Sequence, residues 1–272
     1  MRKVIVFEPD YNDKHRKVLR ALAKGIPGAI VRPVTKYEPC DVAVIFGGVK
    51  RAYRPTWSKQ VVLDRHSGRS LLMVESAFLW RGKYYQVGWG GVAGHADFNT
   101  SVRTPLDRSF AIGLPVKKWR LRPDGPVVVI GQLPRDVQVQ DVDHVAWCRA
   151  TVAYYRAQGL PVIFRSHPKI DTPATYGVDA RYHDTRPLAE VLEEARAVVT
   201  WNSTTGVESV LAGVPTVALD RGAMAYPVAG NDLDALGETP CRAAWLARLA
   251  YSQWTLDEMR AGLPWRHLNQ PS

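Results

Sequence analysis

Small polar residues are concentrated in one short segment of the chain, Val198–Glu208, in which a hydrophobic run leads into a polar turn. The turn holds one amide and three hydroxyl groups, in Asn202, Ser203, Thr204 and Thr205, and the residues after it have the spacing of a helix. The first N–H groups of a helix have no partner inside the helix and carry partial positive charge, so a helix start can bind an anion. Capping a helix requires only one hydroxyl. We therefore predict that this turn binds a phosphate group.

Charged side chains that could complete a phosphate site lie on either side of this turn. Glu208 follows within the same helix and is expected to accept hydrogen bonds from a sugar hydroxyl, and Asp220 follows the next hydrophobic run. Earlier in the chain, Arg165 and His167 follow another hydrophobic run, and Pro168 holds His167 in an extended conformation. A histidine can donate a hydrogen bond to a phosphate, and an arginine adds positive charge. We predict that all four residues face one ligand.

Strands and helices that alternate along the chain must position these residues. In the first half, the sequence predicts strands at Val4–Phe7, Ala29–Pro33, Val42–Phe46, Val61–Leu63 and Leu71–Glu75, a helix at Asp13–Lys24, and a glycine-rich aromatic loop at Tyr84–Phe98. In the second half, it predicts strands at Val127–Ile130, Pro161–Arg165, Ala197–Trp201 and Thr216–Leu219, and helices at Val142–Gln158, Leu188–Ala195 and Thr205–Ala212. The stretch Arg242–Ala261 is expected to be an amphipathic helix.

This alternation predicts an α/β fold with two Rossmann-like domains. Strands that alternate with helices pair in parallel through right-handed crossovers. A polar segment with proline and glycine, Leu121–Pro126, is expected to separate the domains, which we place at 1–122 and 123–240. A C-terminal helical segment, 241–272, is expected to cross back to the first domain. Ligands of such sheets bind at the carboxyl ends of the strands, so we expect the site in a cleft between the two domains.

The order Arg-x-His-Pro, then a further strand with Asn-Ser-Thr-Thr-Gly-x-Glu, resembles the donor-binding half of GT-B glycosyltransferases. It is most similar to the group with a His-Pro motif, which includes bacterial capsule Kdo transferases, sialyltransferases and CDP-glycerol transferases. The likeness covers roughly Val127 to Ala229. In those families the two motifs hold the phosphate of a nucleotide-sugar. The resemblance implies this role for His167, Ser203 and Thr204, extends it to Asn202 and Glu208, and implies a GT-B fold without a donor-bound metal.

Transfer to an acceptor hydroxyl needs a group that takes up the proton, and three carboxylates in the first half are candidates. Asp97 lies in the glycine-rich aromatic loop, Glu75 ends a hydrophobic run, and Asp10 follows the first run. We rank them in that order. The candidate acceptor-binding residues share a positive charge or an aromatic ring in the same half of the chain: Arg51, Arg54, Arg81, Trp89 and His95.

The composition limits the classes of protein to which the chain can belong. Its 272 residues carry 36 Lys and Arg against 26 Asp and Glu, a net charge of +10, which favours a polyanionic partner or a phosphorylated donor. No apolar run is long enough to span a membrane. The three cysteines show no metal-ligand spacing, so we predict no metal site and a cytoplasmic location. The only small molecule expected is a UDP- or CMP-linked sugar, used as a co-substrate.

The sequence leaves the acceptor open between several classes. Basic and aromatic residues interleaved in the first half favour transfer to a hydroxymethylated pyrimidine in double-stranded DNA, as in a phage-type enzyme. The motif likeness alone favours a capsule or surface-glycan transferase. Two further readings are a non-catalytic module that binds nucleotides or nucleic acid, and a sugar-nucleotide epimerase. The oligomeric state is not predicted.

Overall fold

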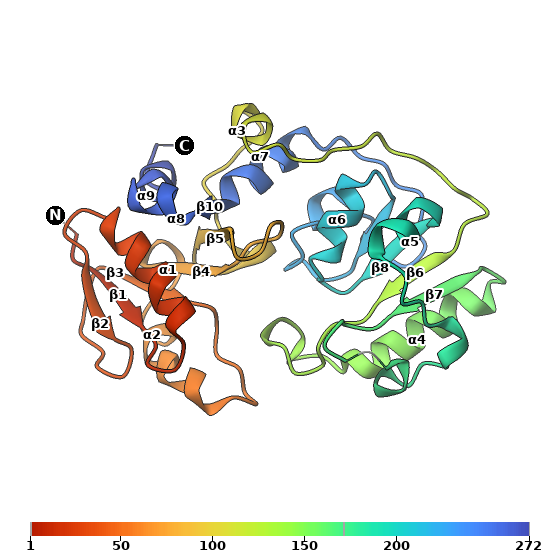
Figure 1. Cartoon of the computed structure of the whole chain (residues 1–272), viewed down its shortest axis with the longest axis horizontal. Helices are drawn as coiled ribbons and strands as arrows, with labels where there is room; N and C mark the ends of the chain where they lie inside the picture. Colours follow the sequence, from red (N-terminus) through yellow and green to blue (C-terminus); the bar gives the residue numbers. More distant parts are fainter. Residues whose placement is uncertain (1, 171, 272) are drawn as a thin grey trace. The chain divides into compact units, whose positions relative to one another are not determined.

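The computed structural model describes residues 2–170 and 172–271, which form two compact units (Figure 1). Unit 1 consists of the chain up to Gly113 together with the chain from Ala243 onward, and unit 2 is Leu114–Arg242. The segment Leu121–Pro126, predicted to join the domains, lies inside unit 2, where Arg196 N donates a hydrogen bond to Pro126 O (2.9 Å). Each unit has its own sheet and its own core, which confirms the α/β two-domain class.

The sheet of unit 1 has six strands in the order β10-β5-β4-β3-β1-β2. Four of them run parallel: β1 (Val4–Glu8), β2 (Ile30–Pro33), β3 (Val42–Phe46) and β4 (Leu71–Ser76). β5 (Tyr84–Trp89) is antiparallel to β4 and to β10 (Gln253–Thr255). The chain crosses to the other side of β1 between β2 and β3, so the order of the parallel strands reverses between β1 and β3. In α/β sheets this reversal marks the place where ligands bind.

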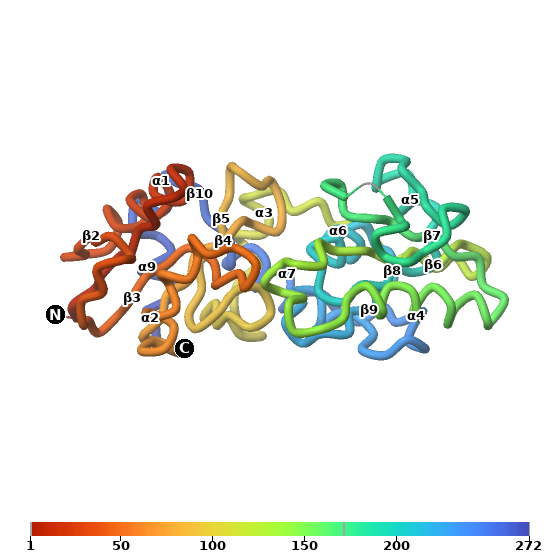
Figure 2. The backbone as a smooth tube through the Cα atoms, turned by 90° about the horizontal axis from the view of Figure 1, so that it is seen from below, coloured from red at the N-terminus to blue at the C-terminus, as the bar shows by residue number. Residues whose placement is uncertain are grey.

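The helices of unit 1 come from both ends of the chain: α1 (Asp13–Lys24), α2 (Gln60–Leu63), α3 (Asp107–Ala111), α7 (Ala243–Ser252), α8 (Leu256–Arg260) and α9 (Leu263–Leu268). Asn12 caps α1 by accepting a hydrogen bond from His15 N (3.1 Å), and the helix buries Val18, Leu19 and Leu22. α8 packs on α1, and Figure 2 follows the C-terminal segment as it returns to the first strands. Trp254, in this segment, is only 3% exposed and belongs to the core of unit 1.

Three predictions of secondary structure in unit 1 were wrong. The run Val61–Leu63 lies in helix α2, since a short apolar run fits a strand and a buried helix equally well. The predicted loop Tyr84–Phe98 begins with β5, whose six residues are all buried; a strand covered on both faces shows no alternation of polar and apolar residues. The predicted helix Arg242–Ala261 is interrupted by β10, because pairing with β5 outweighs the helical pattern.

The sheet of unit 2 has four parallel strands in the order β7-β6-β8-β9. They are β6 (Val127–Ile130), β7 (Val162–Arg165), β8 (Ala197–Thr200) and β9 (Thr216–Ala218), and the helices are α4 (His144–Ala157), α5 (Leu188–Glu194) and α6 (Thr205–Leu211). Short 3₁₀ helices occur in unit 1 at Arg54–Lys59, Gly68–Ser70 and Ala93–His95, and in unit 2 at Val137–Val139, Pro173–Tyr176, Ala180–Tyr182 and Tyr226–Val228. Every strand and helix predicted for unit 2 is present within two residues of its expected ends.

Two further observations concern the chain as a whole. Within the described residues, no helix has the length and apolar character needed to cross a membrane. Cys40, Cys148 and Cys241 are all free thiols, of which Cys148 is buried and Cys241 is exposed.

Candidate active site

The predicted donor-binding residues of unit 2 lie at the carboxyl ends of its strands, which we call the carboxyl edge of the sheet. Arg165 ends β7 and His167 follows it, the Asn-Ser-Thr-Thr turn follows β8, and Asp220 follows β9. Because the four strands are parallel, their carboxyl ends meet at the same edge. The structure brings Asn202 and Asp220 into direct contact, with Asn202 Nδ2 donating to Asp220 Oδ2 at 2.5 Å. The sequence motifs therefore converge on one polar edge.

Asn202 organises this edge from inside. Its side chain is almost fully buried, and Gln132 Nε2 donates to Asn202 Oδ1 at 2.7 Å. Asn202 N donates in turn to Gln132 Oε1 at 3.1 Å, and Asn202 Nδ2 also donates to Gln138 O at 2.8 Å. Both the oxygen and the nitrogen of the Asn202 side-chain amide therefore have hydrogen-bond partners inside the protein. Asn202 thus ties the ends of β6, β8 and β9 together.

The hydroxyl groups after Asn202 are partly used within their own turn. Thr205 N donates to Ser203 Oγ at 3.2 Å, and Ser203 Oγ donates to Thr205 Oγ1 at 3.3 Å. Helix α6 has only seven residues, and Gly206 N already donates to Ser203 O at 3.0 Å. Fewer N–H groups at the start of α6 are therefore available to an anion than the sequence suggested. The Ser203, Thr204 and Thr205 side chains are all half-buried at this edge, while Glu208 is exposed.

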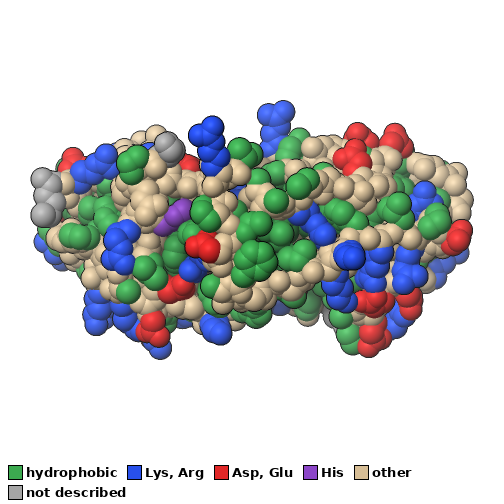
Figure 3. Space-filling view, turned by 90° about the horizontal axis from the view of Figure 1, so that it is seen from above, with side chains coloured by type: hydrophobic (Ala, Val, Ile, Leu, Met, Phe, Trp, Pro, Cys, Tyr) green, Lys and Arg blue, Asp and Glu red, His purple; other side chains and the backbone are tan. Residues whose placement is uncertain are grey.

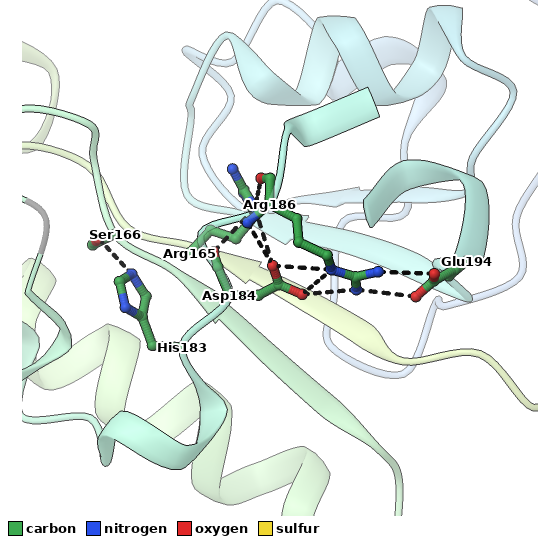
Figure 4. Close-up of polar contacts among 6 residues, drawn as sticks. All are labelled: Arg165, Ser166, His183, Asp184, Arg186 and Glu194. Carbon is green, nitrogen blue, oxygen red and sulfur yellow. Dashed lines mark hydrogen bonds and ion pairs between the residues drawn. The ribbon is translucent and has the colours of Figure 1, made fainter. Parts of the chain in front are cut away.

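Arg165 is held in place by a loop that returns to the edge of the sheet (Figure 4). Its guanidinium donates to Asp184 O at 3.0 Å and to Arg186 O at 2.8 Å. Asp184 and Arg186 form an ion pair at 2.8 Å, and Arg186 also reaches Glu194 at 2.9 Å. The Asp184 and Glu194 carboxylates raise the pKa of the Arg186 guanidinium. Arg165 therefore fastens this loop beside β7, a structural use that the sequence did not indicate.

The hydrogen bond that His167 accepts at Nδ1 leaves Nε2 as the ring nitrogen that can donate. The ring is half-buried, and Lys169 N donates to His167 Nδ1 at 3.1 Å. In a neutral imidazole one nitrogen accepts and the other carries the proton, so the proton of His167 lies on Nε2. This tautomer can donate from Nε2 to an oxygen of a ligand. Tyr176 holds the adjacent backbone, since His167 N donates to Tyr176 Oη at 3.3 Å.

Two histidines near this edge were missed by the sequence analysis. His183 Nε2 lies 2.8 Å from Ser166 Oγ, next to Arg165 (Figure 4). His144 is the first residue of α4, and its Nε2 accepts a hydrogen bond from Gln132 N at 2.8 Å. Burial lowers the pKa of His144 to about 4, so the ring stays neutral. No local pattern marks His183, whereas Gln132 could have been noticed as the first polar residue after a buried strand.

In unit 1, a second polar edge lies at the carboxyl ends of β3 and β4. Lys59 is only 3% exposed, and its Nζ donates to Phe46 O at 2.8 Å and to Gly47 O at 3.1 Å. Gly47 has a φ of +62°, and a Cβ at this position would lie 2.7 Å from Glu75 Oε2. The Glu75 carboxylate is thus packed against the Gly47 backbone, and its Oε1 accepts from Ser76 N at 2.7 Å. Among the three predicted carboxylates, Glu75 is the one that packs against the Gly47 backbone.

Burial of Lys59 beside Glu75 has an electrostatic consequence. Removal from water lowers the pKa of the Lys59 ammonium to about 8, although the Glu75 carboxylate opposes this shift. The Lys59 ammonium and the Glu75 carboxylate are therefore close enough to influence each other electrostatically. No pattern in the sequence marked Lys59, because a single lysine in a polar segment is normally exposed.

Asp97, ranked first as the base, lies at the amino ends of the parallel strands, whereas Glu75 lies at their carboxyl ends. Its backbone pairs with Trp89, which is opposite Leu72 at the start of β4, whereas Glu75 is opposite Gln86. Three residues of strand separate the two positions, about 10 Å. The Asp97 carboxylate forms an ion pair with Arg69 at 3.1 Å and lines a pocket of about 690 Å³. This pocket is at the amino ends of the parallel strands, away from the edge where α/β sheets bind ligands.

Trp89 was predicted to stack on an acceptor, and the structure contradicts this. Its side chain is 1% exposed, and its Nε1 donates to Leu268 O at 3.1 Å. A ring enclosed in the core has no face available to a substrate. His95 is exposed near the Asp97 edge, in the 3₁₀ helix Ala93–His95.

The remaining predicted residues of unit 1 are exposed. Asp10 lies after β1, where Thr35 Oγ1 donates to its carboxylate at 3.4 Å. Arg54 lies over the ring of Trp57 at 5.7 Å, and Arg51 and Arg81 are exposed in two other loops.

The basic and aromatic residues that suggested DNA binding are in part internal contacts. Arg108 lies 3.9 Å from the ring centre of the buried Trp254 and forms an ion pair with Glu258 at 2.6 Å. Arg65 similarly lies over Tyr37 at 4.9 Å. On the face drawn in Figure 3, Lys and Arg side chains lie among Asp and Glu side chains. The predicted DNA-binding surface therefore loses part of its basis.

The described residues contain no group of three or more His, Cys, Asp or Glu side chains arranged to hold a metal ion. The polar groups at the carboxyl ends of the strands in the two units include amides, hydroxyls, histidines, Lys59 and Glu75.

Two solved structures share the fold of this chain. Thermosulfurimonas dismutans KpsC, described as a β-Kdo 2,7 transferase, is similar with a TM-score of 0.58 and 11% identity, covering 97% of this chain and 98% of that chain. A second KpsC structure from the same organism, described as a β-Kdo 2,4 transferase, has a TM-score of 0.53 and 14% identity, covering 92% and 89%. At these identities the likeness establishes the two-domain fold. No protein-family model matches the chain, and no curated protein matches its sequence.

Proposed function

We propose that this protein is a glycosyltransferase that moves a sugar from a nucleotide-sugar donor to a hydroxyl group of a glycan. The observation that carries the proposal is the convergence of the Arg165–His167 and Asn202–Thr205 motifs on the carboxyl edge of unit 2. The fold supports it, since the two similar structures are Kdo transferases that match this chain over nearly its whole length. A fold alone hosts many activities, so the argument depends on what the two edges can do.

Unit 2 supplies the groups that a donor phosphate requires. The Nε2–H group of His167 is suited to donate a hydrogen bond to a phosphate oxygen, and charge-assisted bonds of this kind are among the strongest in proteins. Ser203, Thr204 and Thr205 add hydroxyl groups at the same edge. When the bond between the sugar and the phosphate breaks, the nucleotide leaves with the bonding electrons. A hydrogen bond from His167 would stabilise the negative charge that it gains.

Unit 1 supplies the group that accepts the acceptor's proton. We assign this role to Glu75, because its carboxylate is fixed by Ser76 N and by packing on Gly47 at the carboxyl edge. The proton of the attacking hydroxyl passes to Glu75 as the new bond to the sugar forms. Lys59 stabilises the ionised form of this carboxylate by its charge.

A glycan acceptor, as in capsule synthesis, agrees with the similar structures better than DNA does. Both are transferases of Kdo, so Kdo is the first sugar to test, with UDP- and CMP-linked sugars as the wider class. The arginine–aromatic pairs within unit 1 reduce the surface that DNA could contact. No observation in the structure favours an epimerase or a non-catalytic module over transfer.

The test is a thermal-shift panel of nucleotides and nucleotide sugars on the full chain, followed by transfer assays with the ligands that stabilise it. We expect one nucleotide-sugar to raise the unfolding temperature and to be consumed only when a glycan acceptor is added. Consumption without an acceptor and with a changed sugar would indicate an epimerase instead. Stabilisation by DNA and by none of the sugar nucleotides would contradict the proposal.

A further inference from the structure

Two polar atoms at the carboxyl edge of unit 1 are buried without a hydrogen-bond partner among the described residues. They are Tyr11 Oη and His15 Nδ1. Tyr11 follows β1, and His15 lies in the first turn of α1. Both are therefore beside the reversal of strand order between β1 and β3. Buried polar groups in proteins are nearly always bonded, and each exception calls for an explanation.

Packing holds both rings firmly although it leaves these atoms without partners. The His15 ring stacks on Phe46, the last residue of β3, with ring centres 3.8 Å apart and planes at 10°. The ring of Tyr11 meets Tyr53 edge to face at 5.9 Å. The rings cannot turn toward other partners without losing these contacts, so the two polar atoms remain in fixed positions. Fixed, unsatisfied donors and acceptors are what a pre-formed binding site presents to its ligand.

The neighbours of the two residues connect them with Glu75 and Lys59. Burial raises the pKa of Tyr11 to about 12, and the Glu75 carboxylate contributes to this shift. Burial lowers the pKa of His15 to about 4, helped by the charge of Lys59 and of two other lysines. Near neutral pH, Tyr11 is therefore a protonated phenol and His15 is a neutral imidazole. Such a pair can both donate hydrogen bonds to hydroxyl groups and accept them.

We infer that Tyr11 and His15 bind hydroxyl groups of the acceptor glycan and hold it beside the Glu75 carboxylate. This inference rests on the proposed function and adds the residues that contact the acceptor. A sugar presents adjacent hydroxyl groups that each donate and accept, which matches a phenol and a neutral imidazole four residues apart in the chain. Neither residue stood out in the sequence, because a tyrosine and a histidine in this context are usually structural.

The first experiment compares two tyrosines of unit 1. Tyr37 Oη lies 3.2 Å from His66 Nε2, so Tyr37→Phe breaks an internal hydrogen bond and should lower the unfolding temperature. Tyr11→Phe removes a hydroxyl without such a bond, so the unfolding temperature should stay the same or rise. If Tyr11→Phe lowers it as much as Tyr37→Phe does, the Tyr11 hydroxyl has a structural partner and the inference is wrong.

The second experiment measures binding of simple glycosides to the full chain by saturation-transfer NMR. The probes are the methyl glycosides of glucose, galactose, mannose and N-acetylglucosamine, which lack a nucleotide. We expect at least one probe to bind, and Tyr11→Phe or His15→Phe to weaken it about three- to tenfold, the worth of one neutral hydrogen bond. Tyr37→Phe should leave binding unchanged.

The outcomes separate this inference from the proposed function. Lack of binding by all four glycosides, or binding that neither variant weakens, overturns the inference while donor-dependent transfer can still be measured. Binding that depends on Tyr11 and His15 supports it. If such binding were accompanied by no transfer from any sugar nucleotide, only the assignment as a glycosyltransferase would fail.

Discussion

The two units place polar residues at the same edge of their sheets but satisfy them differently. In unit 2, Gln132, Asn202 and Asp220 bond to one another, so the strand ends are tied together before any ligand binds. In unit 1, the buried Lys59 ammonium interacts electrostatically with the half-buried Glu75 carboxylate, while Tyr11 Oη has no partner among the described residues. Side chains that bond to one another in this way hold the strand ends in fixed positions. An edge with unsatisfied groups needs a ligand to complete it.

The chemical basis of this difference lies in the residue types. The amides of Gln132 and Asn202 both donate and accept, so they can pair with each other in both directions. A lysine has only donors and a carboxylate only acceptors. The side chains at the strand ends of unit 1 are therefore held by charge and by backbone carbonyls. We expect substitutions there to lower the rate of transfer more than they lower the free energy of unfolding.

The largest effect is expected from Glu75→Gln, which removes the proposed base of unit 1 and keeps its size. We expect the rate of transfer to fall about 10²- to 10⁴-fold, the usual contribution of a general base, with donor affinity unchanged. The matched control is Asp97→Asn at the opposite edge of the sheet, which should leave the rate nearly unaltered. Transfer kinetics of the two variants decide between the carboxylates. A larger loss in Asp97→Asn would return the role of the base to Asp97, the residue ranked first from the sequence.

His167→Ala tests the corresponding contact in unit 2. Loss of a charge-assisted hydrogen bond should weaken donor binding by about 1.5–3 kcal/mol, measured by titration calorimetry with the donor or its nucleotide. The unfolding temperature should change little, because the ring is half-buried and the sheet edge is held by Asn202. His95→Ala, an exposed histidine of unit 1, serves as the control with unchanged affinity. Equal donor affinities in the wild type and His167→Ala would refute the role of this residue.

The smallest effect concerns the pH dependence of stability. His144 in unit 2 has a folded-state pKa of about 4 against 6.5 in a free chain, because of burial. Between pH 6.5 and about 4 the unfolded chain therefore binds a proton here that the native state does not. Stability should decrease on the order of 2 kcal/mol as the pH falls through this window. Denaturant unfolding of the wild type and His144→Gln at pH 7 and pH 4.5 measures it.

In His144→Gln the side-chain oxygen can still accept from Gln132 N, and the acid-sensitive group is gone. We expect the free energy of unfolding of His144→Gln to fall less between pH 7 and pH 4.5 than that of the wild type. The remainder should include the contribution of His15 in unit 1, which has a shift of the same direction. If the stability of the two proteins falls equally with pH, the burial of His144 is not the cause of the loss of stability in acid.

Much of unit 2 followed from its sequence because its strands are short, apolar and separated by helices with clear ends. The same rule fails in unit 1 at β5, where the segment Tyr84–Trp89 is buried on both faces and shows no alternation. It fails at β10, which is a strand only because β5 lies beside it. Local patterns report local preferences, and partners distant in the chain can override them.

The sequence by itself determined the α/β class, the motifs of unit 2 and the strand ends that carry them, since apolar runs and polar turns are local signals. It also identified Glu75 as one of three possible bases. The tertiary structure decided among the residues. It enclosed Trp89 in the core, placed Asp97 at the other edge of the sheet, and gave Asn202 internal partners. It also buried Lys59 beside Glu75, because burial and hydrogen bonding depend on neighbours that the chain brings together only on folding.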